Sequence, residues 1–190
     1  MPELQSGCEI TAANIVLNYL GYQASKADLL KYLPVSNDFR TVSGKKYGPN
    51  PWKAFAGSPD TARYGCYSPV IANTINEYLL NQGGSHTAYS FTGVPADRLY
   101  SCIDAGVPVI VWVTSGMQEP AAGDGWYLAD SGAYCQWVSR EHCMVLIGYN
   151  EDQAIFCDPL DSRESVSYGK ALFTKRYEAL FSQAVAAVPS

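Results

Sequence analysis

Apolar residues recur at helical spacing near the start of the chain, at Ile10, Ala13, Val16, Leu17 and Leu20. This period predicts a helix over residues 8–20 that ends before Gly21. Residues 25–28 (SKAD) have the sequence of a capping box and predict a second helix through about Leu33. Three further helices are predicted over residues 68–84, over 95–105, and late in the chain around residues 173–181.

Continuous apolar runs predict strands in the second half of the chain. Residues 107–114, 142–149 and 153–158 are rich in β-formers, and a tight turn is predicted at 150–152. Shorter strands are expected at 86–91, 163–168 and 183–188. Because helices precede mostly antiparallel strands, the pattern predicts an α+β fold. We expect a single domain over residues 1–190, with a helical part over about 1–105 and a sheet part over about 106–190.

Two segments lack a regular period and are predicted to be loops, residues 35–67 and 115–136. The first is either a functional or mobile segment or an inserted surface excursion, and the sequence favours neither. Trp52, Tyr64, Tyr67, Trp126 and Trp137 lie in or beside these loops. As a set they are candidates for the rim of a groove that binds substrate.

Composition narrows the possible partners. The chain has 190 residues, 16% of them charged, and a formal net charge of -5. No basic patch is visible, so no nucleic-acid partner is expected. The longest apolar run, residues 106–113, is too short to span a membrane, so we expect no transmembrane segment. The oligomeric state stays open.

The six cysteines show no C-x-x-C spacing, and the chain has only two histidines. A zinc site is therefore not expected, and no metal or other cofactor is assigned. An even number of cysteines permits disulfides, which a domain of this size does not require. Disulfides and redox compartment are left open.

Cys8 stands at the predicted start of the first helix, one residue after Gly7. A helix N-terminus favours the thiolate, which is the reactive form of cysteine. The backbone N–H of Cys8 is also a free donor that could bind an oxyanion. Cys8 is thus a candidate nucleophile, and a small buried core residue is the alternative.

His142 and Asp158 are predicted to meet across the hairpin formed by residues 142–149 and 153–158. Facing residue numbers in this hairpin sum to roughly 300–302, which places His142 opposite residues 158–160. A carboxylate there can fix the imidazole tautomer and stabilise the imidazolium. A purely structural His–Asp hydrogen bond is the alternative.

The rival residues fit catalysis less well. His86 has no acidic residue at a recognisable partner position, and a surface or strand-end role is expected. Asp161 could orient His142 but falls beyond the hairpin register. Cys143 is expected to face away from His142 into the core. Cys102 and Cys157 also fit the core, whereas Cys66 lies in a predicted loop and is uncertain.

The order Cys8, His142, Asp158 is typical of papain-like thiol enzymes. The segments PELQSGCEITAANIVLNYLGY, NPWKAFAGSPDTARYGCYSPVIANTINEYL, GVPVIVWVTSGM, EHCMVLIGYN and DPL resemble, in order, the blocks of the C39-like peptidase family. This family is related to the bacteriocin-processing peptidases. The resemblance covers nearly the whole chain and implies a papain-like fold, with Cys8, His142 and Asp158 at the catalytic positions.

The chain departs from the family pattern at one position. Papain-like enzymes place a glutamine about six residues before the nucleophile to complete the oxyanion hole, and this chain has Pro2 there. Either Gln5 substitutes, or the donor lies upstream of the sequence given, or the hole is incomplete. Losing one such donor costs about 10²–10³-fold in rate.

Three functions are weighed. The first is a cysteine peptidase that hydrolyses peptides or proteins through an acyl-thioester and needs no cofactor. The second is an amidase or acyltransferase that uses the same three residues. The third is a catalytically weak papain-like domain that binds peptides. Free-standing relatives imply a bacterial protein that is secreted or held at the cell surface, from which a leader has been removed. A cytoplasmic location stays open.

Overall fold

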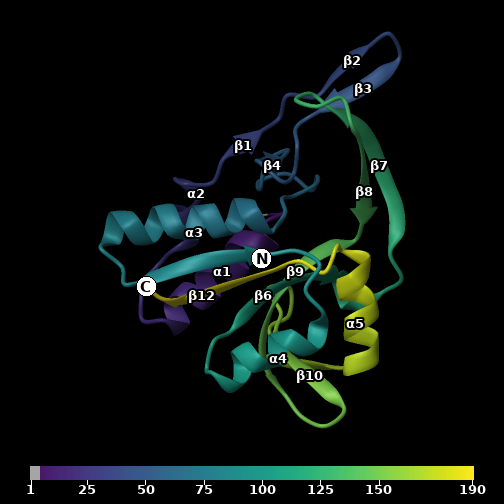
Figure 1. The fold of residues 1–190 in the computed structure, drawn as a ribbon. Coiled ribbons are helices and arrows are strands. Elements are labelled where there is room, and N and C mark those ends of the chain that lie inside the picture. Colours follow the sequence, from purple (N-terminus) through teal and green to yellow (C-terminus); the bar gives the residue numbers. More distant parts are fainter. Residues whose placement is uncertain (1–4) are drawn as a thin grey trace.

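The computed structural model describes residues 5–190 and shows an α+β architecture built on a six-stranded sheet (Figure 1). The sheet is antiparallel throughout, in the order β11-β10-β9-β6-β12-β5. Its strands are β5 (His86–Phe91), β6 (Val109–Thr114), β9 (Glu141–Tyr149), β10 (Gln153–Cys157), β11 (Val166–Gly169) and β12 (Ala184–Pro189). The predicted strands are therefore confirmed, and β5 joins the same sheet although it precedes the other five strands in the chain.

Helices cover both faces of this sheet. The helices are α1 (Cys8–Tyr19), α2 (Lys26–Leu30), α3 (Ser68–Gln82), α4 (Ala96–Asp104) and α5 (Lys170–Ala179). Helices α1 and α3 pack on one face, and α4 and α5 pack on the other (Figure 1). Strand β6 is buried along its whole length because Ile110 and Trp112 face α1 and α3, whereas Val109 and Val111 belong to the opposite core. Two covered faces explain its uninterrupted apolar sequence.

The capping box before α2 forms as predicted, but the helix is shorter than expected. The Ser25 hydroxyl accepts the N–H of Asp28, and the Asp28 carboxylate accepts the N–H of Ser25. The helix ends at Leu30 rather than at about Leu33. Beyond it, the Pro34 carbonyl accepts the N–H of Phe55 at 2.7 Å, which draws the chain into strand pairing instead.

The two segments predicted to be loops are in part a second sheet, which corrects the sequence-based expectation. Residues 35–67 contain β1 (Val35–Ser36), β2 (Arg40–Val42), β3 (Lys45–Gly48) and β4 (Phe55–Ala56). Residues 115–136 contain the short 3-10 helix η1 (Ser115–Met117), all of β7 (Ala121–Leu128) and the start of β8 (Tyr134–Ser139). Strands β2, β3, β7 and β8 form a four-stranded sheet, here called the arm, which projects beyond the main sheet (Figure 1).

Glycines interrupt the alternation of apolar and polar residues that would have predicted strands in the arm. Gly125 leaves room for the ring of Tyr134 on the neighbouring strand, which a side chain at this position would meet. The stretch Gly123-Asp124-Gly125 interrupts the alternation of β7, but Trp126 is fully buried and its indole N–H donates to the Pro49 carbonyl at 2.8 Å. Tertiary packing around one tryptophan thus replaces the alternating pattern that marks most strands.

No helix within residues 5–190 is long and apolar enough to cross a membrane.

Candidate active site

Cys8 is the first residue of α1 and lies where this helix packs against β9. Its N-cap is Gly7, which brings no side chain over the sulfur, and Cys8 is 8% exposed. A hydrogen bond from the Cys143 thiol is the largest cause that lowers the pKa of Cys8 well below its usual value. Burial opposes it, and the hydrogen bond and charge of His142 support it. The surroundings therefore favour the thiolate.

His142 is held by Asp158 from the side away from Cys8. His142 Nε2 lies 2.6 Å from Asp158 Oδ1, and the two side chains are only 2% and 8% exposed. Nδ1 is then the ring nitrogen left for the Cys8 sulfur. Burial alone would lower the pKa of His142, but hydrogen bonds with Asp158 and Cys8 and their charges raise it to about 10. The imidazolium form is therefore favoured beside a thiolate.

The register of the β9–β10 hairpin agrees with the predicted pairing. Cys157 pairs with Val145, and a bulge separates Ile155 from Phe156. Continued beyond β10, this register sets His142 opposite Leu160 rather than Asp158. Asp158 reaches the imidazole because the chain turns after it, with Asp158 Oδ1 also accepting the N–H of Leu160 at 2.9 Å.

The candidate residues surround a cavity of about 110 Å³. Its lining consists of Gln5, Ser6, Gly7, Cys8, Tyr64, Glu141, His142 and Leu160. The structure therefore brings Gln5, Cys8 and His142 to one pocket, with Asp158 behind the histidine. Pro2, which stands at the family's glutamine position, lies outside the described residues.

Two acidic residues at this site, Glu9 and Glu141, were not singled out from the sequence, and they are neighbours of Cys8 and His142 in the chain. Cys143, which was expected in the core, is fully buried and contacts the Cys8 sulfur. Cys8 Sγ and one carboxyl oxygen each of Glu9 and Glu141 lie within 4.8 Å of one another. Such a spacing could hold a metal ion. However, the sulfur already contacts His142 and Cys143, and Glu9 accepts a backbone N–H, so no metal is assigned.

The predicted aromatic rim is mostly internal, which is a second correction. Trp126, Tyr67 and Trp137 are 0%, 1% and 6% exposed, and Trp52 packs on Tyr67. These rings bury themselves against one another because the arm and the main sheet share a core there. Of the five candidates, Tyr64 alone lines the cavity beside Cys8. Trp137 borders a neighbouring hollow instead.

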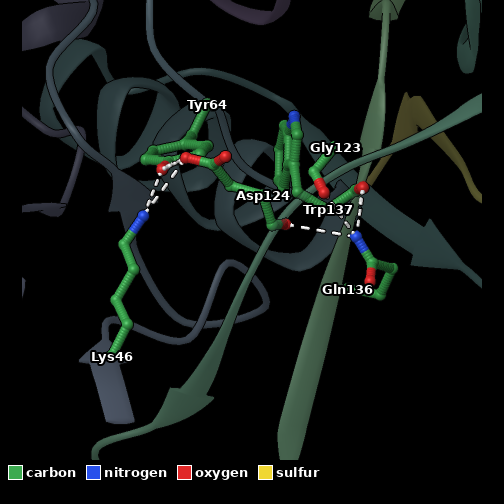
Figure 2. Close-up of polar contacts among 6 residues, drawn as sticks. All are labelled: Lys46, Tyr64, Gly123, Asp124, Gln136 and Trp137. Carbon is green, nitrogen blue, oxygen red and sulfur yellow. Dashed lines mark hydrogen bonds and ion pairs between the residues drawn. The ribbon is translucent and has the colours of Figure 1, made fainter. Parts of the chain in front are cut away.

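Tyr64 is fixed at this position by a polar cluster on the arm (Figure 2). Its hydroxyl donates to Asp124 at 2.6 Å and accepts from Lys46 Nζ at 2.7 Å, while Lys46 and Asp124 pair at 3.2 Å. The backbone of Tyr64 has a φ of 53°, a strained conformation for a bulky residue. The arm thus sets one wall of the cavity.

The rival residues lie elsewhere or have other partners. His86 Nδ1 lies 2.8 Å from the Tyr22 hydroxyl, on the edge strand β5, and Asp161 pairs with Arg163. Cys66 and Cys143 are fully buried, whereas Cys102 and Cys157 are partly exposed. All six cysteines are free thiols in this structure.

Sequence and structure comparisons show the family and the fold of this chain. Residues 2–185 match the model of the Peptidase_C39 like family. The chain belongs to this family. The uncharacterized protein YvpB of Bacillus subtilis (strain 168) is 26% identical over 190 residues, which cover 97% of this chain and 70% of that protein. The crystal structure of a candidate C39-like peptidase from Bacillus anthracis superposes with a TM-score of 0.86 at 26% identity, covering 100% of this chain and 92% of the other. The α+β architecture is therefore the C39-like peptidase fold.

Proposed function

We propose that this C39-like protein is a cysteine peptidase that hydrolyses peptide bonds through an acyl-thioester on Cys8. The observation that carries the proposal is the contact of 2.6 Å between His142 Nε2 and Asp158, with the other ring nitrogen left for the sulfur. Membership of a peptidase family and the lowered pKa of Cys8 support it.

Each residue has a distinct role in this proposal. The Cys8 thiolate attacks the substrate carbonyl, and His142 protonates the leaving amine, which releases the first product and leaves the acyl group on sulfur. His142 then removes a proton from water, which attacks the thioester and regenerates the thiol. Asp158 holds the ring orientation and stabilises the imidazolium. The first-turn N–H of Cys8 and the Gln5 side chain are the candidate oxyanion donors.

A peptide-library digest read by mass spectrometry tests this function. Cys8→Ala should abolish cleavage and also remove rapid labelling by iodoacetamide. Cys102→Ala is the matched control because Cys102 is a partly exposed thiol on α4 and does not line the cavity. Full cleavage by Cys8→Ala would overturn the proposal.

The same digest separates hydrolysis from acyl transfer. The acyl-thioester accepts water or an amine by the same chemistry, so parallel reactions with added small primary amines are needed. Hydrolysed ends in both reactions identify a peptidase, and amide-linked ends identify an acyltransferase. A Cys8 that reacts no faster than an ordinary free thiol, without cleavage, identifies a binding domain.

A further inference from the structure

Two acidic side chains crowd the sulfur of the nucleophile. Glu9 lies in the first turn of α1 and is 1% exposed, and Glu141 is the first residue of β9. One oxygen of each lies within 4.8 Å of the other and of Cys8 Sγ. Gly65 closes the space behind them, because a Cβ there would collide with Glu9 Oε1 and lie 3.2 Å from Glu141 Oε2.

The contacts of these carboxyls leave one oxygen unsatisfied. Glu9 Oε1 accepts the N–H of Cys66 at 2.9 Å, and Glu9 Oε2 lies 3.3 Å from Cys8 Sγ. Glu141 Oε1 is buried and has no hydrogen-bond partner among the described residues. Within residues 5–190, neither glutamate forms an ion pair with a lysine or arginine.

Two ionised carboxylates are not stable together in such a place. Burial is the largest cause that raises the pKa of both glutamates well above the usual range, and the negative charge of Cys8 adds to it. Neighbouring buried carboxyls without a cation share protons rather than ionise together. At neutral pH the pair therefore carries at least one proton, which can be donated.

We propose that Glu9 and Glu141 act as one proton-holding carboxyl pair that donates a hydrogen bond to the Cys8 sulfur when the sulfur is a thiolate. This role rests on the proposed function of Cys8 as nucleophile and makes both glutamates positioning residues. When the thiol proton moves to His142, the Glu9–Sγ contact reverses: the thiol donates to the carboxyl before transfer, and the carboxylic acid donates to the thiolate after it. The pair keeps its own proton throughout.

The charge around the Cys8 sulfur depends on pH through every titratable group that faces the carboxyl pair. These groups are Cys8 on α1, Cys66 and Tyr67 before and at the start of α3, and His142 and Cys143 on β9. The Tyr67 hydroxyl is also buried, and it has no hydrogen-bond partner in the described part of the chain. Of these groups only His142 gains positive charge, and Asp158 holds it. Loss of the shared proton would place a further negative charge beside the sulfur, and this would raise the pKa of Cys8.

Infrared spectroscopy of the unmodified protein tests the shared proton directly. A carbonyl band of a protonated carboxylic acid should be present at neutral pH and should weaken in both Glu9→Gln and Glu141→Gln. No substrate is involved in this measurement. Absence of the band at neutral pH would overturn the proposal, whether or not the variants fold.

Alkylation of Cys8 tests the hydrogen bond to sulfur. The rate of iodoacetamide labelling against pH, read on the Cys8 peptide by mass spectrometry, reports the thiolate fraction. Glu9→Met keeps the length of the side chain but has no donor, so labelling near neutral pH should slow by about tenfold or more. Glu9→Gln offers an amide N–H to the sulfur and should restore most of the rate.

Two outcomes separate this role from simpler ones. Equal profiles for Glu9→Gln and Glu9→Met, with circular dichroism showing both folded, would mean that Glu9 only fills space and would overturn the proposal. If the band and the alkylation profiles behave as expected but no peptide is cleaved, the proposed peptidase function fails and the carboxyl pair stands.

Discussion

The two sides of the Cys8–His142 contact hold acidic groups in opposite states. On one side, burial would raise the pKa of Asp158, but the hydrogen bond and charge of His142 lower it below its usual value. On the other side, Glu9 and Glu141 have no lysine or arginine partner in the part of the chain that the structure describes, and burial raises the pKa of both. Partners rather than residue type therefore decide which carboxyl is charged. An ionised acid holds the base, and a protonated acid can face the nucleophile.

The largest effect is expected from removing the group between the two sides. His142→Ala takes away the base and the partner of the thiolate, so turnover should fall by about 10⁴-fold or more. Alkylation of Cys8 near neutral pH should also slow. Steady-state cleavage of a peptide found in the library digest measures the first effect. Turnover within tenfold of the parent would contradict the assigned role of His142.

A smaller loss is expected on the ionised side. Asp158→Asn keeps the shape but removes the charge that helps raise the pKa of His142 to about 10. Turnover should fall by about 10²–10⁴-fold. As pH rises through the pKa of His142 the imidazolium is lost, so the alkaline limb of the rate profile should move to lower pH in the variant.

Asp161→Asn is the matched control for this substitution. Asp161 lies three residues further along and pairs with exposed Arg163 rather than with His142. Its variant should keep both the rate and the alkaline limb. If Asp161→Asn, and not Asp158→Asn, shifts the limb, Asp161 is the residue that orients His142.

The contact of Asp158 with His142 could be predicted from the sequence, but the meeting of Glu9 with Glu141 could not. The hairpin register places an acid near His142 because strand pairing is periodic and local. Nothing periodic connects Glu9, in the first turn of a helix, with Glu141, which starts a strand over a hundred residues later. Their meeting depends on how α1 docks on β9 and on a glycine at position 65. Strands β7 and β8 were missed for a related reason, since the packing of one buried tryptophan on each strand, Trp126 and Trp137, replaces their alternation.

The protonated side should show in the pH dependence of stability. The folded pair holds a proton that the unfolded chain releases above pH about 4.3. The free energy of unfolding should therefore fall as pH rises from there toward the folded pKa of the pair. Glu141→Gln removes this cost and should gain about 1–2 kcal/mol over the parent near neutral pH. Urea denaturation at several pH values measures it, and a difference independent of pH would contradict a shared proton.

A weaker effect is expected where the arm meets the cavity. Tyr64→Phe keeps the ring but removes the hydroxyl that binds Lys46 and Asp124 (Figure 2). The cavity wall that Tyr64 forms should become less rigid, and KM should rise by about fivefold. This change is close to the free energy of one hydrogen bond. The value of kcat should change little because neither side of the Cys8–His142 contact is altered. A loss of kcat as large as that of Asp158→Asn would place Tyr64 in the chemistry instead.

The smallest effect is expected at His86, the other histidine. It has the same imidazole ring but neither Asp158 nor the glutamate pair beside it. His86 lies on the edge strand β5, separated from β9 by β6 and β12, and its ring nitrogen contacts Tyr22 at 2.8 Å. His86→Ala should leave cleavage and Cys8 alkylation unchanged and lower the free energy of unfolding by about 1 kcal/mol. A marked loss of cleavage in this variant, with the fold intact, would show that the function depends on more than the acids beside one imidazole.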